Sequence, residues 1–253
     1  MSGIWTLFRR ELSAYFVSPV AYIVLLFFLV VTGASFSLLV DFFNKASTMS
    51  GGTEVSVIQA FFQTVFFWFA LILIIPIITM RLFAEEKRQG TIETLMTAPV
   101  TDIAVVLSKY LASFVFYLIL WLPTLCYVFI IRGISKDTTP FEWGTVLGSF
   151  AGVVLIGAFY LSIGLFASSL TRNQIIAAVV GFAVIAVLFF CGFLSFLEAS
   201  GWQQKIIEYI SSIEHMREFS RGTVDTRRIV FYLSLTVFML FLTQRVIESR
   251  KWK

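Results

Sequence analysis

The sequence predicts an all-α membrane protein built as a bundle of six transmembrane helices. The first reason is composition, because 58% of the residues are hydrophobic and 13% are charged, whereas soluble domains have about 45–50% and about 25%. The second is that 29 Phe and 6 Trp carry more apolar surface than one aqueous core can bury. The third is that six long uncharged stretches divide the chain.

Residues 3–18 have the pattern of an amphipathic helix that lies in the lipid headgroup layer. One face is apolar and contains Ile4, Leu7, Phe8, Leu12, Tyr15 and Phe16. The opposite face contains Thr6, Arg9, Arg10 and Ser13, and we expect its arginines to contact lipid phosphates. Pro19 then turns the chain into the first span. The alternative is the basic start of a cleaved signal peptide, but such a peptide normally has a shorter apolar region.

The uncharged stretches are 20–40, 55–80, 110–131, 143–171, 173–197 and 229–244. They predict spans at about 20–40, 55–80, 104–131, 143–170, 173–197 and 228–247. Charges mark the span ends, because a charge near the bilayer centre costs about 2.5–3.5 kcal/mol. The first five stretches cross a hydrocarbon core of about 30 Å at about 1.5 Å per residue. The sixth is shorter, and it spans if Arg227, Arg228 and Arg245 snorkel at its ends. Cys126 and Cys191 fall inside spans, where we expect packed free thiols.

An even number of spans places both termini on one side of the membrane, and the charges identify that side. The side of the termini carries eleven of the 19 Lys and Arg and six of the 15 Asp and Glu. Its net charge is therefore +5, against −1 for the other side. By the positive-inside rule, both termini are cytoplasmic in a bacterial inner membrane. The basic residues form no compact patch, so we expect no nucleic-acid partner.

The chain lacks the motifs of metal, redox and nucleotide chemistry. It has one His and no HExxH, CxxC, GxxxxGK[ST] or strand-linked GxGxxG motif. We therefore expect no enzyme activity, cofactor or metal site on this chain. The uncharged stretches also hold none of the carboxylates or histidines that ion-driven carriers use inside the membrane. A transport function would thus take its energy from a partner.

Residues 81–102, between the second and third spans, predict a helical stalk followed by a short helix. The second span extends as a stalk through Glu85 and Glu86 and ends at Gly90, a typical C′ residue. Thr91 can cap a second helix at about 91–98, and Pro99 stops it. This helix presents an apolar face of Ile92, Leu95 and Met96. The face either contacts a partner, or lies on the lipid surface or under the bundle.

The run from Glu85 to Pro99, Glu-Glu-Lys-Arg-Gln-Gly-Thr-Ile-Glu-Thr-Leu-Met-Thr-Ala-Pro, resembles the signature of ABC-2 type transporter permeases. The resemblance covers almost the whole chain, and the run from Ser212 to Asp225 is similar to permeases of gliding-motility and nitrous-oxide-reductase-maturation operons. It implies a type V exporter-like architecture. It also implies a dimer with a second permease chain and two ATP-binding subunits that hold ATP and Mg²⁺.

In such permeases the ATP-binding subunit docks on the short cytoplasmic helix, called the coupling helix. The resemblance therefore assigns coupling to Glu85, Glu86, Gly90, Thr91, Ile92, Glu93, Leu95, Met96 and Pro99. Arg9 and Arg10 are candidates for a second docking surface, as an alternative to lipid contacts.

The segment 198–227 is too long for a plain turn. Ile206, Ile207, Ile210 and Ile213 recur at nearly helical spacing, which predicts a helix against the outer leaflet. We expect this helix to pack Ile206, Ile207 and Ile210 against the spans. The resemblance implies that this segment covers the translocation path, with Glu214, His215, Arg221 and Gly222 as gate residues. The alternative is that His215 is a solvated loop residue and Gly222 is part of a turn.

Two groups of residues within the spans leave alternatives open. The first group is aromatic and either lines a dry path or packs in the core and against lipid: Phe61, Phe62, Phe66, Phe67, Trp68, Phe69, Phe182, Phe189, Phe190, Phe193 and Phe196. The second group is small and favours close helix packing: Gly148, Gly152, Gly157, Ser162 and Gly164.

The predicted function is that of the permease subunit of an ATP-driven ABC-2 transporter. One alternative is a scaffold that transmits force from an ABC ATPase to an auxiliary extracytoplasmic protein. The other is an ion-coupled secondary carrier, which the missing intramembrane charges disfavour.

Overall fold

The computed structural model describes residues 2–50, 56–91, 100–134, 143–193 and 202–249, and its regular elements there are all helices. They are α1 (Ser2–Val17), α2 (Pro19–Ser50), α3 (Val57–Gln63), α4 (Val65–Thr79), α5 (Arg81–Gln89), α7 (Asp102–Trp121), α8 (Thr124–Ile134), α9 (Trp143–Leu170), α10 (Gln174–Phe193), α11 (Trp202–Ile210), α12 (Ser212–Ser220) and α13 (Thr226–Glu248). Six helical stretches in the described part are long and apolar enough to cross a membrane. The predicted fold class and the predicted number of spans are therefore confirmed.

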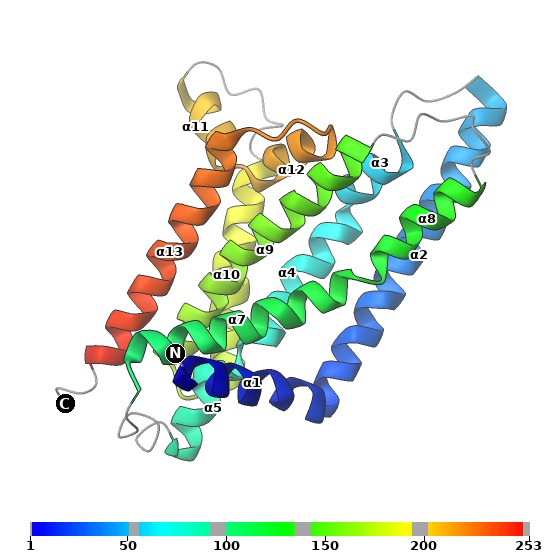
Figure 1. Ribbon diagram of the computed structural model, residues 1–253. Coiled ribbons are helices and arrows are strands. Elements are labelled where there is room, and N and C mark those ends of the chain that lie inside the picture. The colour runs from blue at the N-terminus through cyan, green and yellow to red at the C-terminus, as the bar shows by residue number, and fades with distance from the viewer. Residues whose placement is uncertain (1, 51–55, 92–99, 135–142, 194–201, 250–253) are drawn as a thin grey trace.

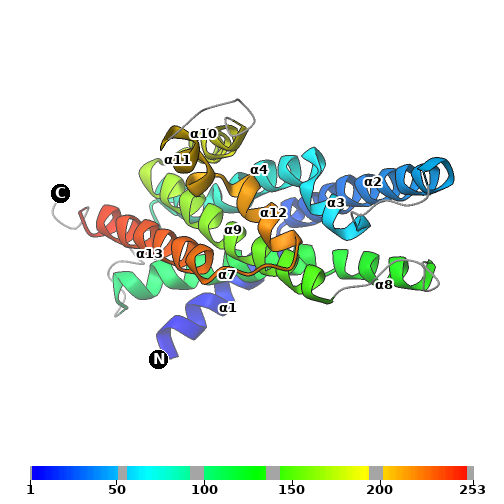
Figure 2. The same cartoon turned by 90° about the horizontal axis from the view of Figure 1, so that it is seen from above.

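The bundle has two distinct ends (Figure 1). Helices α1 and α5 and the last turns of α13 lie at one end, which we call the stalk end. Helices α3, α11 and α12 lie at the opposite end, which we call the α12 end. Seen from above, α12 crosses over the helices of the bundle (Figure 2).

Two of the predicted spans are interrupted. The second does not run unbroken from 55 to 80, because Thr64 adopts an extended conformation and its hydroxyl accepts a hydrogen bond from the Phe67 amide, which caps α4 and leaves α3 separate. The third breaks between α7 and α8, and Pro123 at this break has no amide hydrogen to continue the helix. Both interruptions are local effects within strongly apolar sequence.

The remaining boundaries differ less. Helix α2 continues to Ser50, well past the predicted end at residue 40, and so contains Asp41 and Lys45. Helix α9 matches its prediction, whereas α10 is described as far as Phe193 and α13 begins at Thr226. The thiol of Cys126 is exposed and that of Cys191 is partly buried, so the packed position predicted for Cys126 is wrong.

Helix α9 is the centre of the bundle and packs against α13, α10, α12, α4, α5 and α7. Its glycines allow this closeness. A Cβ added at Gly157 would overlap the Tyr117 ring, and one at Gly164 would overlap Thr79. A Cβ added at Gly148 or at Gly152 would likewise overlap residues of α12, and Ser162 is fully buried. The predicted close packing at these small residues is confirmed.

The aromatic residues divide between the core and the exposed surface. Phe61, Phe62, Phe67 and Trp68 are buried, and the Phe62 and Phe67 rings both pack near Trp121. Phe66, Phe69, Phe182, Phe190 and Phe193 are exposed. A cavity of about 10 Å³ lies among Phe36, Phe61, Tyr127 and their neighbours, which is room for about one water molecule. Core packing is thus the interpretation that the buried aromatic residues support, and Phe196 lies outside the described residues.

Candidate functional site

The stalk α5 extends the second span beyond the bundle and ends at Gly90. Lys87 and Arg88 occupy its last turn, where cations are favourable to the helix dipole. Gly90 has φ +73°, the left-handed conformation that the sequence predicted for it. Thr91 follows in helical conformation, and its hydroxyl donates to the Glu86 carbonyl at 3.4 Å. The other predicted coupling residues, Ile92, Glu93, Leu95, Met96 and Pro99, lie outside the described residues.

Three consecutive stalk residues contact three different helices. Successive residues on an α-helix point about 100° apart, so the three side chains leave α5 in different directions. Glu85 accepts a hydrogen bond from Gln174 at the start of α10. Glu86 forms an ion pair with Lys109 of α7 at 2.7 Å. Lys87 is buried and donates to the Ser169 carbonyl near the end of α9.

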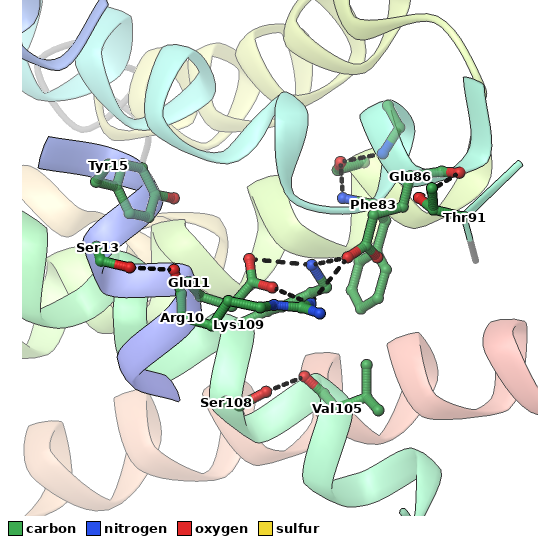
Figure 3. A network of polar contacts seen from close by, with 12 residues as sticks. Arg10, Glu11, Ser13, Tyr15, Phe83, Glu86, Thr91, Val105, Ser108 and Lys109 are labelled. Carbon is green, nitrogen blue, oxygen red and sulfur yellow. Dashed lines mark hydrogen bonds and ion pairs between the residues drawn. The ribbon is translucent and has the colours of Figure 1, made fainter. Parts of the chain in front are cut away.

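Around Glu86 lies a cluster of four charged residues, which we call the ion cluster: Arg10, Glu11, Glu86 and Lys109 (Figure 3). The Lys109 side chain is 2% exposed and lies 2.7 Å from Glu86 and 3.1 Å from Glu11. The Arg10 guanidinium lies 2.7 Å from Glu11 and 3.5 Å from Glu86. The cluster therefore joins α1, α5 and α7 with balanced charge.

The ion cluster keeps Glu11 charged in a largely buried place. Burial alone raises the pKa of Glu11, but the Lys109 ammonium and the Arg10 guanidinium outweigh it, so that the pKa of Glu11 is lowered. The second carboxylate oxygen of Glu86, Oε2, is buried and has no hydrogen-bond partner among the described residues. Because buried ion pairs are costly to break, we interpret Lys109 as the residue on which the cluster depends.

A cleft of about 780 Å³ opens beside the ion cluster. Its lining comes from α1, α5, α7 and both flanks of the undescribed segment 92–99: Leu7, Arg10, Glu11, Ala14, Tyr15, Arg81, Leu82, Glu85, Glu86, Gln89, Thr91, Val100 and Lys109. Both residues that bound that segment, Thr91 and Val100, thus face the cleft. The amphipathic helix and the stalk form one continuous surface at this end.

Sequence reasoning missed three residues of this site: Glu11, Lys87 and Lys109. It treated charges as span ends, and it expected no ionisable residue within a span. That expectation is wrong at the stalk end, where the span-length helices contain Glu86, Lys87 and Lys109. The sequence does carry one indication of where Lys109 lies. Thr101 caps α7, so Lys109 falls two turns inside this helix and not at its end. Sequence reasoning also did not foresee that Arg10 pairs with Glu11 and Glu86, while its side chain stays 56% exposed.

At the α12 end, His215 is buried and not a solvated loop residue. Its Nδ1 lies 2.8 Å from the Tyr232 hydroxyl of α13, and its ring packs on Phe231. Burial, together with the nearby Arg228 guanidinium, lowers the pKa of His215 to about 4. His215 is therefore neutral at neutral pH and fixes α12 against α13.

The other three gate candidates lie around the rim of α12. Glu214 pairs with Arg217 on the same helix at 2.8 Å, and Arg221 is exposed at the C-cap. Gly222 has φ +78°, the left-handed conformation of a turn residue. A Cβ added at Gly222 would lie 3.0 Å from the Gly144 backbone and 3.2 Å from the Thr145 amide nitrogen. Of the predicted isoleucines, Ile213 packs against the core, Ile207 is partly buried and Ile210 is 40% exposed. The predicted packing is wrong for Ile210, and the side chain of Ile206 lies outside the description.

The family model described as ABC-2 family transporter protein matches residues 13–252. This range includes the stalk, the ion cluster apart from Arg10 and Glu11, and all six span-length helices. No curated protein matches the chain.

Proposed function

Since the chain belongs to the ABC-2 family of transporter proteins, we propose that it is the permease subunit of an ATP-driven transporter in a bacterial inner membrane. Two copies of the permease, or one copy and a close paralogue, assemble with two copies of a separate ATPase subunit. The ATPase subunit carries the ATP and Mg²⁺. This chain supplies the translocation path and the surface on which the ATPase subunit docks. An auxiliary extracytoplasmic protein is a further partner that this arrangement accommodates.

The observation that supports this function best is the construction of the stalk. It ends at the left-handed Gly90, so that the chain leaves α5 at a fixed angle just before residues 91–98, the coupling helix of the resemblance. Its residues Glu85, Glu86 and Lys87 hold α10, α7 and α9. A force applied to the coupling helix therefore reaches several spans, where a single free stalk would tilt one span alone.

The stalk end is the cytoplasmic end in this proposal. Both described chain ends, α1 and the end of α13, lie there (Figure 1), and this side carries the excess of Lys and Arg. The α12 end then faces outward, with His215 holding α12 in place and Glu214, Arg221 and Gly222 at its rim. In this arrangement α12 is the outer gate.

The test is the substitution Leu95→Asp in the coupling helix. Docked helices concentrate their binding energy in a few central apolar side chains, so this change should cost about 2–4 kcal/mol in assembly. The measurement is the amount of ATPase subunit that co-purifies with the permease from membranes. Leu95→Met, which keeps the apolar contact, is the matched control and should retain the ATPase subunit.

A Leu95→Asp chain that inserts normally, keeps its ATPase subunit and transports at the wild-type rate contradicts the proposal. The permease purified without its partner should hydrolyse no ATP, because its sequence holds no phosphate-binding loop. An ATPase activity that is lost on mutating a residue of this chain contradicts that part.

A further inference from the structure

Helix α9 holds the stalk end of the bundle through the side chain of Ser168. The Ser168 hydroxyl accepts hydrogen bonds from the backbone amides of Phe83 (3.1 Å) and Ala84 (3.2 Å). It also donates one to the carbonyl of Met80 at 2.9 Å. A hydroxyl has one donor and two acceptor positions, so this buried side chain is fully used on one short stretch of backbone.

That stretch of backbone is the joint between α4 and α5. Helix α4 ends at Thr79 and α5 begins at Arg81, with Met80 between them and Pro76 one turn before. A side chain that bonds to the backbone at such a point is a recognised cause of helix bends. Thr79 in addition packs on Gly164 of α9, where no Cβ fits. Helix α9 thus touches both sides of the joint.

The other half of α9 holds α12 with the same closeness. A Cβ added at Gly148 would overlap the Phe219 carbonyl, and one at Gly152 would lie 2.9 Å from the Met216 sulfur. The Tyr160 hydroxyl donates to the Ser212 hydroxyl at 3.0 Å. Both ends of α12 therefore rest on α9.

Helix α9 is also the stiffest connection between these two places. It is one unbroken helix of 28 residues, and most of it is buried among its neighbours. Helix α4 is interrupted at the joint, and the links from Glu85 and Glu86 to α10 and α7 run through long side chains. Closely packed interiors transmit displacement with little loss.

We propose that α9 is a strut that carries movement of the stalk to α12, and that Ser168 is the positioning residue through which the movement enters. This inference rests on the proposed function, because the ATPase subunit supplies the movement. When the stalk shifts, Met80 moves and Ser168 moves with it. Helix α9 then slides against Phe219 and Met216 of α12. Helix α12 is then displaced, which opens the outer end.

The test measures the exposure of α12 in the assembled complex. Cys126 and Cys191 are replaced by Ala, and Ser220→Cys is introduced, because Ser220, the last residue of α12, is fully buried. A membrane-impermeant maleimide is added from the outer side, with and without ATP. In this background ATP should raise the labelling rate about tenfold, a typical magnitude for coupling between distant sites.

Ser168→Ala should reduce this ATP response to less than twofold while the ATPase subunit still co-purifies. The matched control is Ser169→Ala. Among the described residues, the Ser169 hydroxyl bonds only to the Phe166 carbonyl within α9, and the Ser169 carbonyl still accepts from Lys87. The control should keep the full response. Hydrogen exchange at the amides of Phe83 and Ala84 should accelerate in Ser168→Ala and not in the control, which shows that the joint was loosened.

The outcomes separate the two proposals. If the Ser220→Cys background shows no ATP response, the proposed function fails and the strut fails with it. If the background responds and Ser168→Ala responds equally, only the strut is overturned. If Ser168→Ala does not fold, Tyr160→Phe tests the strut from its other end. That variant should lose the response, and an unchanged response there overturns the strut.

Discussion

Removing the buried ammonium of the ion cluster should destabilise the permease more than any exposed ion pair can. In Lys109→Met the side chain stays unbranched and nearly as long, and it loses its charge. Glu11 and Glu86 then lose a partner at 3.1 Å and 2.7 Å. Leaving a buried charge unpaired costs about 3–5 kcal/mol. Because Arg10 still pairs with Glu11 at 2.7 Å, we expect a loss near the lower value, about 3 kcal/mol.

The assay is reversible unfolding of the purified permease in lipid–detergent micelles, followed by tryptophan fluorescence. The matched control is Arg245→Met, which removes a pair of similar length, 2.9 Å, whose side chains are 59% and 38% exposed. Exposed pairs contribute about 0–1 kcal/mol. The control should therefore be nearly neutral.

The pH dependence identifies the cause of the loss. Without Lys109, Glu11 keeps only Arg10 as its partner in the cluster, and burial raises the pKa of Glu11 above its unfolded value of about 4.3. The folded variant then binds more protons than the unfolded chain, so that its stability rises as the pH falls from 7 toward about 4.3. A Lys109→Met chain that loses less than about 1 kcal/mol, or that becomes less stable over this pH range, refutes the reasoning.

Three further predictions concern α9, His215 and Gly90. Gly157→Ala places a Cβ against the Tyr117 ring and should cost about 1–3 kcal/mol in unfolding free energy, whereas Gly133→Ala, which meets nothing within 4 Å, should not destabilise; equal values contradict the packing. The pKa of His215 is lowered to about 4, so the stabilising effect of the neutral imidazole is complete above about pH 6.5 and falls by up to about 1.4 kcal/mol per pH unit as the pH drops toward 4. His215→Gln should remove this pH dependence of stability in thermal melts, and an unchanged pH dependence contradicts the prediction. Gly90→Val should preserve binding of the ATPase subunit but uncouple ATP hydrolysis from transport, since the left-handed conformation costs about 1–2 kcal/mol for a residue with a Cβ; Gly90→Asn is the control, and full coupling in Gly90→Val argues against the role of this turn.

The sequence predicted features that depend on near neighbours in the chain. Gly90 followed a basic last turn, and its left-handed conformation is the ordinary result of that local pattern. The small residues of α9 indicated close packing, which Gly157 and Gly164 show. Uncharged length predicted six spans because lipid imposes that length on any helix.

Features that depend on distant contacts were not predictable in this way. Lys109 looked like the end of a span, because only the fold brings Glu11 and Glu86 to it and makes its burial tolerable. His215 was predicted to be a gate residue or a solvated loop residue, but it is buried, with the Tyr232 hydroxyl and the Phe231 ring of α13 against it. Thr64 and Pro123 interrupt apolar runs that hydrophobicity alone treats as continuous.

The length of α2 has a consequence at its polar end. At about 1.5 Å per residue, the 32 residues of α2 are far longer than a hydrocarbon core of about 30 Å. Helix α2 would need a tilt beyond the usual range of about 0–40° to fit inside, so that its last turns, with Asp41 and Lys45, extend into water. The apolar residues before Asp41, 20–40, cover only about 31 Å. A thicker membrane therefore draws Asp41 toward the hydrocarbon, where a charge is costly, and lipid composition acts on this protein through the end of α2.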